Sequence, residues 1–172
     1  YRGDFETGWR EYEWRWQKPD FASNRRDYPQ PQWRGNTDVA GKTILLFSEQ
    51  GFGDTIEFCR YATLLAERGA TVLLEVQAAL VPLVKSLPGA AGVFARGEAL
   101  PPFDLQCPIM SLPLAFKTEL ATIPANVPYL AASPEKTALW KFKLGAKTKP
   151  RIGLAWTGSP TQKNDRNRST TL

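Results

Sequence analysis

The sequence of 172 residues contains no histidine, only two cysteines and a single methionine. Without histidine the chain cannot form a Ser-His-Asp triad, and it lacks the side chain that most often serves as a general acid or base near neutral pH. Cys59 and Cys107 have no metal-ligand spacing and are too few for a disulfide framework. We expect no metal site and a reduced, cytoplasmic protein, in which any catalysis depends on carboxylates, lysine, tyrosine or backbone groups.

Long hydrophobic runs and dense blocks of positive charge are also missing. No apolar stretch approaches the roughly 18 residues that a membrane span needs, and the charged first residues do not form a signal peptide. Although the net charge is +5, the basic residues are dispersed apart from Arg25-Arg26 and the segment 147–168, which argues against nucleic-acid binding. The chain begins at Tyr1 rather than at Met, so we expect a piece of a longer protein.

Large aromatic side chains recur near the N-terminus at the spacing of one helix face, at Phe5, Trp9, Tyr12 and Trp16. Glu11 and Arg15 are placed for an i,i+4 ion pair on the flank of this helix, and Pro19 ends it. Residues 19–40 carry prolines, asparagines and a glycine without periodicity, so they are predicted to be a linker.

A different pattern begins at Gly41. Residues 43–47 (TILLF) and 71–76 (TVLLEV) are continuous apolar runs typical of buried parallel strands, and shorter strands are predicted at 92–95 and 103–107. Helices are predicted after Asp54, over 78–86 and 112–120 and over 134–144, with a last strand at 151–156. This alternation predicts an α/β fold, a Rossmann-like parallel sheet with helices on both faces, preceded by one amphipathic helix.

The segment 49–55 (EQGFGDT) is the strongest candidate site, because it follows the first strand and open α/β sheets bind ligands at the carboxyl ends of their strands. Gly51 and Gly53 would let backbone N–H groups approach a ligand, and a helix N-terminus favours negative charge. Alternatively, the glycines only make the turn and Asp54 only caps the helix. Asp104, at the end of another strand, either points into the same cleft or is a cap.

Two further interpretations concern phosphate groups. Gly51 and Gly53 match part of a dinucleotide fingerprint, and Glu75 stands about 20 residues later where a ribose-binding acid would be. Ile56 replaces the third glycine, but a nicotinamide or flavin cofactor remains an alternative. After the last predicted strand, small hydroxyl residues and a lysine could hold phosphate oxygens, or form a solvated loop: Thr157, Ser159, Thr161 and Lys163.

Two stretches resemble known families. Residues 3–9 (GDFETGW), followed by Tyr12 and Glu13, are similar to the second helix of a tetratricopeptide repeat. Residues 48–61 (SEQGFGDTIEFCRY), 102–108 (PFDLQCP), 111–113 (SLP) and 151–168 resemble bacterial tetratricopeptide-repeat proteins that continue into a glycosyltransferase-like region. That region is similar in layout to O-linked N-acetylglucosamine transferases, and its glycine-Asp loop is similar to that of the ADP-heptose heptosyltransferases.

This resemblance implies the first lobe of a two-lobe GT-B glycosyltransferase. Its domains would be a remnant repeat helix at 1–18, a linker at 19–40, a Rossmann-like lobe at 41–149 and the start of the donor-binding lobe at 150–172. It implies that Asp54 is the general base on the acceptor hydroxyl. Residues around it would bind substrate (Glu49, Gln50, Gly51, Phe52, Gly53 and Thr55), and the second loop would bind the donor diphosphate (Thr157, Ser159, Thr161 and Lys163).

The chain departs from the family in two ways. Gln106 stands where relatives often have histidine, so an acid/base role there is lost. The second lobe has barely begun at Leu172, so we expect this piece not to catalyse transfer on its own. The sequence thus predicts the acceptor-side lobe of a sugar transferase. Its partners would be a nucleotide-sugar donor (a substrate, with no cofactor), a protein or glycan acceptor and possible peptides on the repeat domain. The alternative is a non-catalytic, repeat-linked protein-binding scaffold.

Overall fold

The computed structural model describes residues 3–22, 24–159 and 164–170. The chain divides into two compact units, Tyr1–Ser133 and Pro134–Leu172. The first unit contains the sheet and the N-terminal helical segment, and the second contains one helix and an extended segment.

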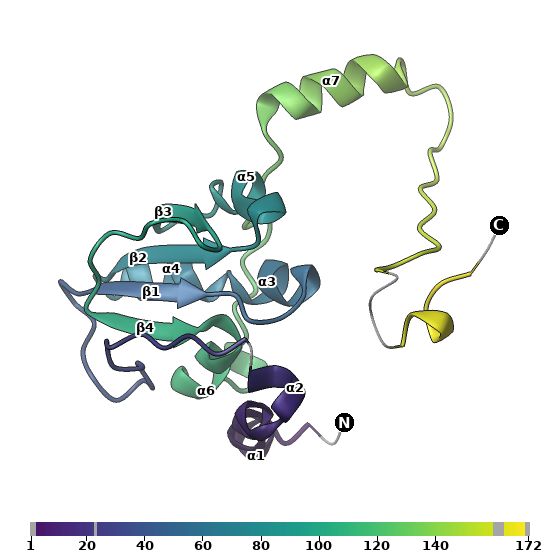
Figure 1. The fold of residues 1–172 in the computed structure, drawn as a ribbon. Helices are drawn as coiled ribbons and strands as arrows, with labels where there is room; N and C mark the ends of the chain where they lie inside the picture. The colour runs from purple at the N-terminus through teal and green to yellow at the C-terminus, as the bar shows by residue number, and fades with distance from the viewer. Residues whose placement is uncertain (1–2, 23, 160–163, 171–172) are drawn as a thin grey trace. The chain divides into compact units, whose positions relative to one another are not determined.

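The first unit is built on four parallel strands (Figure 1): β1 (Thr43–Phe47), β2 (Thr71–Val76), β3 (Ala90–Ala95) and β4 (Leu105–Pro108). Their order in the sheet is β3-β2-β1-β4. The sheet and the helix that precedes it confirm the predicted α/β, Rossmann-like class. β1 and β2 have the predicted bounds, because central parallel strands are buried on both faces and so require continuous apolar runs.

The strand order reverses at β1. The chain proceeds from β1 through β2 to β3 on one side and then returns to the opposite side of β1 for β4. In open α/β sheets, such a reversal opens a crevice outside the carboxyl ends of the two strands concerned. Here those ends are Phe47 and Pro108, which are register partners. We call this place the switch point.

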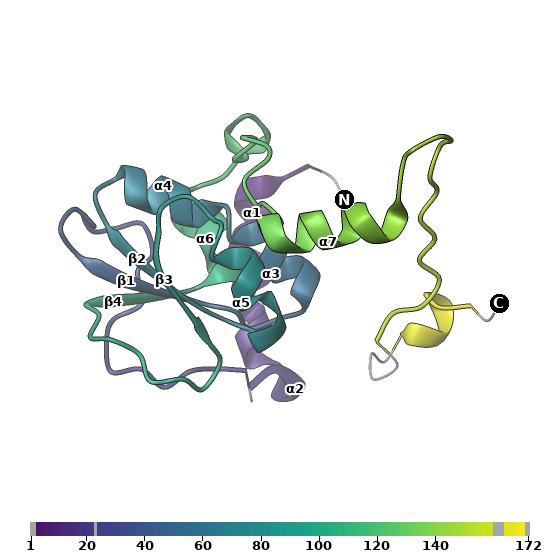
Figure 2. The ribbon, with the colours of Figure 1, turned by 90° about the horizontal axis from the view of Figure 1, so that it is seen from above.

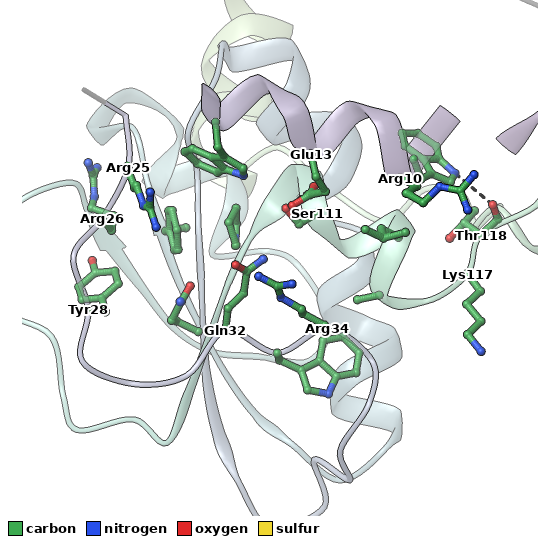
Figure 3. Close-up of a pocket in the computed structure, with 18 of the residues that line it drawn as sticks. Arg10, Glu13, Arg25, Arg26, Tyr28, Gln32, Arg34, Ser111, Lys117 and Thr118 are labelled. Atoms are coloured by element: carbon green, nitrogen blue, oxygen red, sulfur yellow. Dashed lines mark hydrogen bonds between the residues drawn. The ribbon is translucent and has the colours of Figure 1, made fainter. Parts of the chain in front are cut away.

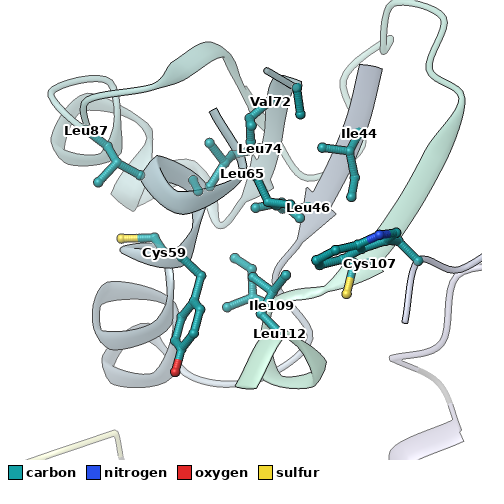
Figure 4. Packing of buried hydrophobic residues seen from close by; sticks show 14 of the residues in the cluster. Ile44, Leu46, Cys59, Leu65, Val72, Leu74, Leu87, Cys107, Ile109 and Leu112 are labelled. Atoms are coloured by element: carbon teal, nitrogen blue, oxygen red, sulfur yellow. The ribbon is translucent and has the colours of Figure 1, made fainter. Parts of the chain in front are cut away.

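One face of the sheet packs against helices α4 (Tyr61–Glu67), α5 (Val81–Val84) and α6 (Leu112–Ala115) (Figure 2). Figure 4 shows Ile44, Leu46, Val72 and Leu74 directed toward Leu65 of α4 and toward the segment of Ile109 and Leu112. All seven are at most 1% exposed. Burial of each such side chain contributes about 1.5–3 kcal/mol to stability. The cluster that these residues form on this face holds most of the core.

The opposite face is covered by the segment predicted to be a linker. The Tyr28 ring lies 5.7 Å from Phe47 of β1 and 5.3 Å from Phe103, both edge-to-face. The segment then runs along β4, where the Trp33 N–H donates to the Gln106 carbonyl at 2.8 Å. Trp33 is only 2% exposed. Tyr28 therefore packs on this face of the sheet, whereas Trp33 packs beside the edge strand β4.

The N-terminal helix is shorter than predicted. α1 spans Phe5–Tyr12 and is followed by a 3₁₀ turn at Glu13–Gln17 and a short helix α2 at Pro19–Ala22. The predicted surface ion pair between Glu11 and Arg15 is wrong, because the tighter turn directs Arg15 into the protein, where it pairs with Glu13 and Glu49.

Three other predicted helices also differ. The one predicted over 78–86 is a 3₁₀ turn at Ala78–Leu80 followed by α5, which ends at Val84. The helix after the glycine loop is divided into α3 (Phe52–Phe58) and α4, because the turn tightens at Cys59, whose carbonyl accepts the Ala62 N–H three residues later. The helix predicted over 112–120 ends at Ala115, because Lys117 has a left-handed φ of 52° that an α-helix cannot include.

The second unit contains the predicted helix α7 (Pro134–Leu144) and a 3₁₀ turn at Asp165–Asn167. The strand predicted over 151–156 is wrong. Ile152 and Leu154 are 84% and 75% exposed, and the described part of this unit contains no other strand with which the segment could pair. Throughout the described residues, every helix is too short or too polar to cross a lipid bilayer.

Candidate functional site

A buried carboxylate lies at the switch point. Glu49 is the second residue after β1 and is 3% exposed. Its Oε1 accepts a bond from Arg15 Nη2 at 3.0 Å and from the Met110 N–H at 3.3 Å. Its Oε2 is buried without a hydrogen-bond partner among the described residues. Burial raises the pKa of Glu49 to about 7, and the Arg15 charge opposes that rise.

Arg15 connects both sides of the switch point. Besides the bond to Glu49, its Nη2 donates to Ser111 Oγ at 2.7 Å and its Nη1 donates to Glu13. Ser111, which follows β4, donates in turn to Glu13 at 2.8 Å. These four residues form what we call the switch-point network. The N-terminal segment, the end of β1 and the end of β4 are therefore joined by charge-assisted hydrogen bonds.

The loop 49–55 is held from two sides. On one side the Gln50 amide donates to the Tyr12 hydroxyl of α1. On the other, Gln77, just past β2, donates to the Gln50 carbonyl at 2.7 Å and accepts from Thr55 Oγ1 at 3.0 Å. Thr55 is 1% exposed, so it faces the protein interior.

Asp54 caps the helix that it was predicted to begin. Helix α3 begins at Phe52, and Asp54 Oδ2 accepts the Gly51 N–H at 2.9 Å. This bond from the N-cap N–H to the carboxylate three residues later fixes the side-chain direction at the helix N-terminus, and glycine has no side chain to return it. Phe52 is 52% exposed and the two loop glycines are also exposed. The loop thus presents an apolar ring and two exposed glycines beside an oriented carboxylate.

The predicted phosphate-binding residues belong to the second unit. Thr157 and Ser159 lie in an exposed stretch. Between them, the Gly158 N–H donates to Ser169 Oγ at 2.9 Å. Thr161 and Lys163 lie outside the described residues. The predicted phosphate-binding set and the loop 49–55 therefore belong to different units, and a role in donor binding stays a prediction.

Two carboxylates considered from sequence have other partners. Asp104 does not point into the cleft: its Oδ2 accepts the Thr43 N–H at 2.8 Å, at the amino end of β1, because it precedes β4 and parallel strands align their starts. Glu75 is buried beside Arg26, with Nε to Oε2 at 3.3 Å, and accepts the Gly97 N–H at 3.2 Å.

A cleft of about 880 Å³ adjoins the network, between α1 with its 3₁₀ turn and the segment 25–34. In Figure 3, Arg25, Arg26 and Tyr28 lie at one end and Arg10 and Lys117 at the other. Cations and carboxylates both line it: Arg10, Arg25, Arg26, Arg34 and Lys117 face Glu6, Glu13, Asp27 and Glu119. Aromatic rings contribute the apolar surface, from Trp9, Trp16, Tyr28, Trp33 and Phe47.

Sequence reasoning did not predict this cleft. The sequence contains two features that line it, the aromatic repeat near the N-terminus and the Arg25-Arg26 pair. Neither feature indicates which distant segments pack together. Gln106, noted as a replacement for histidine, lies in the cleft wall, and its Oε1 is buried without a hydrogen-bond partner among the described residues. Ser111 and Glu13, at the junction with the network, have no distinctive sequence context.

Comparison with known proteins gives no match for this chain among family profiles, curated proteins or solved structures. Within the described ranges, no three His, Cys, Asp or Glu side chains are grouped to hold a metal ion.

Proposed function

We propose that this chain is the acceptor-side lobe of a GT-B-like sugar transferase, which moves a sugar from a nucleotide-sugar to an acceptor hydroxyl. The observation that carries the proposal is the position of the loop 49–55. It follows β1 at the point where the strand order reverses, and the network of Arg15 and Glu49 separates it from the cleft. In open α/β sheets this is where ligands bind.

We assign to the cleft the part of a glycan acceptor that lies away from the reacting hydroxyl, because none of residues 49–55 lines the cleft. A sugar offers apolar C–H faces to aromatic rings and a rim of hydroxyls that both donate and accept hydrogen bonds. The wall supplies rings, guanidinium donors, carboxylate acceptors and the Gln106 amide, with five cations against four carboxylates. A nearly balanced charge of this kind suits a polar, weakly charged ligand, and the volume is within the usual range for a small-molecule site.

Asp54 is the proposed general base. Its Oδ2 accepts the Gly51 N–H, which leaves the other oxygen to accept a proton from an acceptor hydroxyl. An ordinary carboxylate suffices, because the hydroxyl becomes acidic only as its bond to the sugar forms. The exposed loop backbone and the residues proposed for the diphosphate, Thr157, Ser159, Thr161 and Lys163, would stabilise the leaving group.

Binding to the chain tests the acceptor site directly. Amide chemical shifts of the 172-residue chain are followed during titration with neutral mono- and disaccharides, including N-acetylglucosamine and mannose. We expect shifts at residues 49–54 and along the cleft at 106 and 111. Shifts confined to Glu75, Arg96 and Gly97, which line a separate pocket, would contradict the proposed location.

A non-catalytic scaffold is the second candidate, and one observation favours it. Arg15 fills the switch point with the protein's own cation, and Asp54 already has a structural role as a cap. A scaffold predicts no thermal stabilisation by uridine, guanosine or adenosine diphosphate sugars at millimolar concentration in the longest natural form of the protein. A transferase predicts stabilisation by one of them.

A further inference from the structure

The N-terminal helical segment contributes two side chains to the loop 49–55. Tyr12 lies at the end of α1 and Arg15 in the following 3₁₀ turn. The Tyr12 hydroxyl accepts a bond from the Gln50 amide, and Arg15 Nη2 donates to Glu49 Oε1 at 3.0 Å. The first two residues of the loop are thus each held by a residue more than thirty positions earlier in the chain.

Glu49 depends on this contact more than the other loop residues do. Its side chain is completely buried. Among the described residues, Arg15 is the one cation that forms an ion pair with it. A buried carboxylate without a countercharge must either take up a proton or move toward water. Since Glu49 joins β1 to the glycine turn, any outward movement displaces the backbone of Gly51 and Gly53.

We propose that Arg15 is a positioning residue for the loop 49–55: through Glu49 it holds the loop in the conformation in which Asp54 and the exposed glycine backbone face a ligand. The assignment of a ligand to this loop rests on the proposed function, whereas the control of the loop by Arg15 does not. The N-terminal segment is then a part of the site rather than a neighbouring module.

A second contact in the chain provides a matched control. Arg26 also lies in the N-terminal part, and it also pairs with a buried carboxylate, Glu75, whose side chain is 6% exposed. Glu75 lies within β2, however, and among the described residues Arg26 forms its hydrogen bond and ion pair with Glu75 rather than with the loop. Replacing either arginine leaves one buried glutamate without its partner, but only Arg15 should alter the loop.

The experiment is hydrogen–deuterium exchange of the full chain as wild type, R15M and R26M, followed in the peptides that cover 49–55 and 71–76. We expect exchange in 49–55 to rise about tenfold or more in R15M, because a hydrogen bond to a charged group is lost, and to change less than about twofold in R26M. Protection of 71–76 should remain in R15M. Equal exchange of 49–55 in R15M and wild type, or an equal rise in both variants, overturns the proposal.

Two milder variants keep the test decisive if R15M does not fold. R15K retains the charge without the forked geometry, and Y12F removes only the hydroxyl that holds Gln50. Each should increase exchange in 49–55 by a few-fold, as expected for one weakened hydrogen bond, while 71–76 stays protected. Unchanged exchange in both overturns the proposal. These readouts involve no substrate, so failure to detect sugar transfer would contradict the proposed function without altering this result.

Discussion

Arg15 Nη2 lies 3.0 Å from Glu49 Oε1, although the two residues are 34 positions apart and both are buried. Removing one partner of a buried ion pair is strongly destabilising, because the other charge stays buried without compensation. Ser111 accepts a further bond from Arg15, and the Met110 N–H donates a further bond to Glu49. The pair joins the N-terminal segment to the sheet where the candidate site lies.

Stability should depend on pH through Glu49. Its pKa rises from 4.5 in a free side chain to about 7 in the folded protein, mainly because of burial. Between these values the folded state binds more protons than the unfolded state, so the free energy of unfolding falls as pH rises from about 4.5 to about 7. The contribution is about 3 kcal/mol, at 1.36 kcal/mol per unit of pKa.

The measurement is urea unfolding of wild type and E49Q from pH 4.5 to pH 8. The charged groups that contact Glu49 or its network are Arg15 and Glu13, and both are retained in E49Q. The unfolding free energy of wild type minus that of E49Q should therefore decrease as the pH rises across this range. A difference that is independent of pH would show that Glu49 does not titrate there.

Both thiols should be unreactive in the native protein. Burial raises the pKa of Cys59 to about 12 and raises that of Cys107 well above its ordinary value, and both side chains are fully buried. Since the thiolate is the reactive form, alkylation by iodoacetamide at pH 8 should be slower than in the urea-unfolded chain by about 100-fold or more. Rapid modification of either cysteine without denaturant would contradict the packing around the core face of the sheet.

Alanine substitutions at Gly35 and Gly97 distinguish the cost of backbone strain from the cost of a steric clash. Both have positive φ, 78° and 91°, but a Cβ at Gly35 would lie 1.9 Å from the Ala115 carbonyl oxygen, whereas a Cβ at Gly97 meets nothing within 4 Å. G97A should therefore cost about 1 kcal/mol from backbone strain alone. G35A should cost distinctly more, because the linker segment must move away from α6, and equal unfolding free energies of the two variants would contradict this docking.

The sequence predicted the parts of the fold that depend on local pattern. The apolar runs TILLF and TVLLEV identified β1 and β2 to the residue, and the glycines placed the loop between β1 and α3. Helix ends were less predictable. The ends of α1 and α6 depend on a 3₁₀ turn after Tyr12 and on a left-handed Lys117, and neither residue type requires that conformation.

Contacts between distant segments could not be predicted from one sequence. Arg15 has the spacing of a surface ion pair with Glu11, yet the 3₁₀ turn after Tyr12 makes it the partner of Glu49. Asp104 resembled a strand-end acid in the cleft, but the alignment of β4 with β1 places it at the amino ends. Residues 151–156 have the composition of a strand, but a strand also needs a neighbour to satisfy its backbone.

The most direct test of the account is sugar transfer by the longest natural form of the protein, as wild type, D54N and D104N. Asp54 and Asp104 each accept one backbone N–H, at 2.9 and 2.8 Å, so both variants weaken a similar bond, but only Asp54 lies in the loop at the carboxyl end of β1. The assay measures release of nucleoside diphosphate from uridine, guanosine and adenosine diphosphate sugars. A glycan and protein extract of the source organism serves as the acceptor. We predict that D54N lowers kcat by about 100-fold or more, the usual contribution of a general base, while D104N retains wild-type turnover. Wild-type turnover in D54N, or an equal loss in both variants, would contradict the assignment of the loop as the acceptor site.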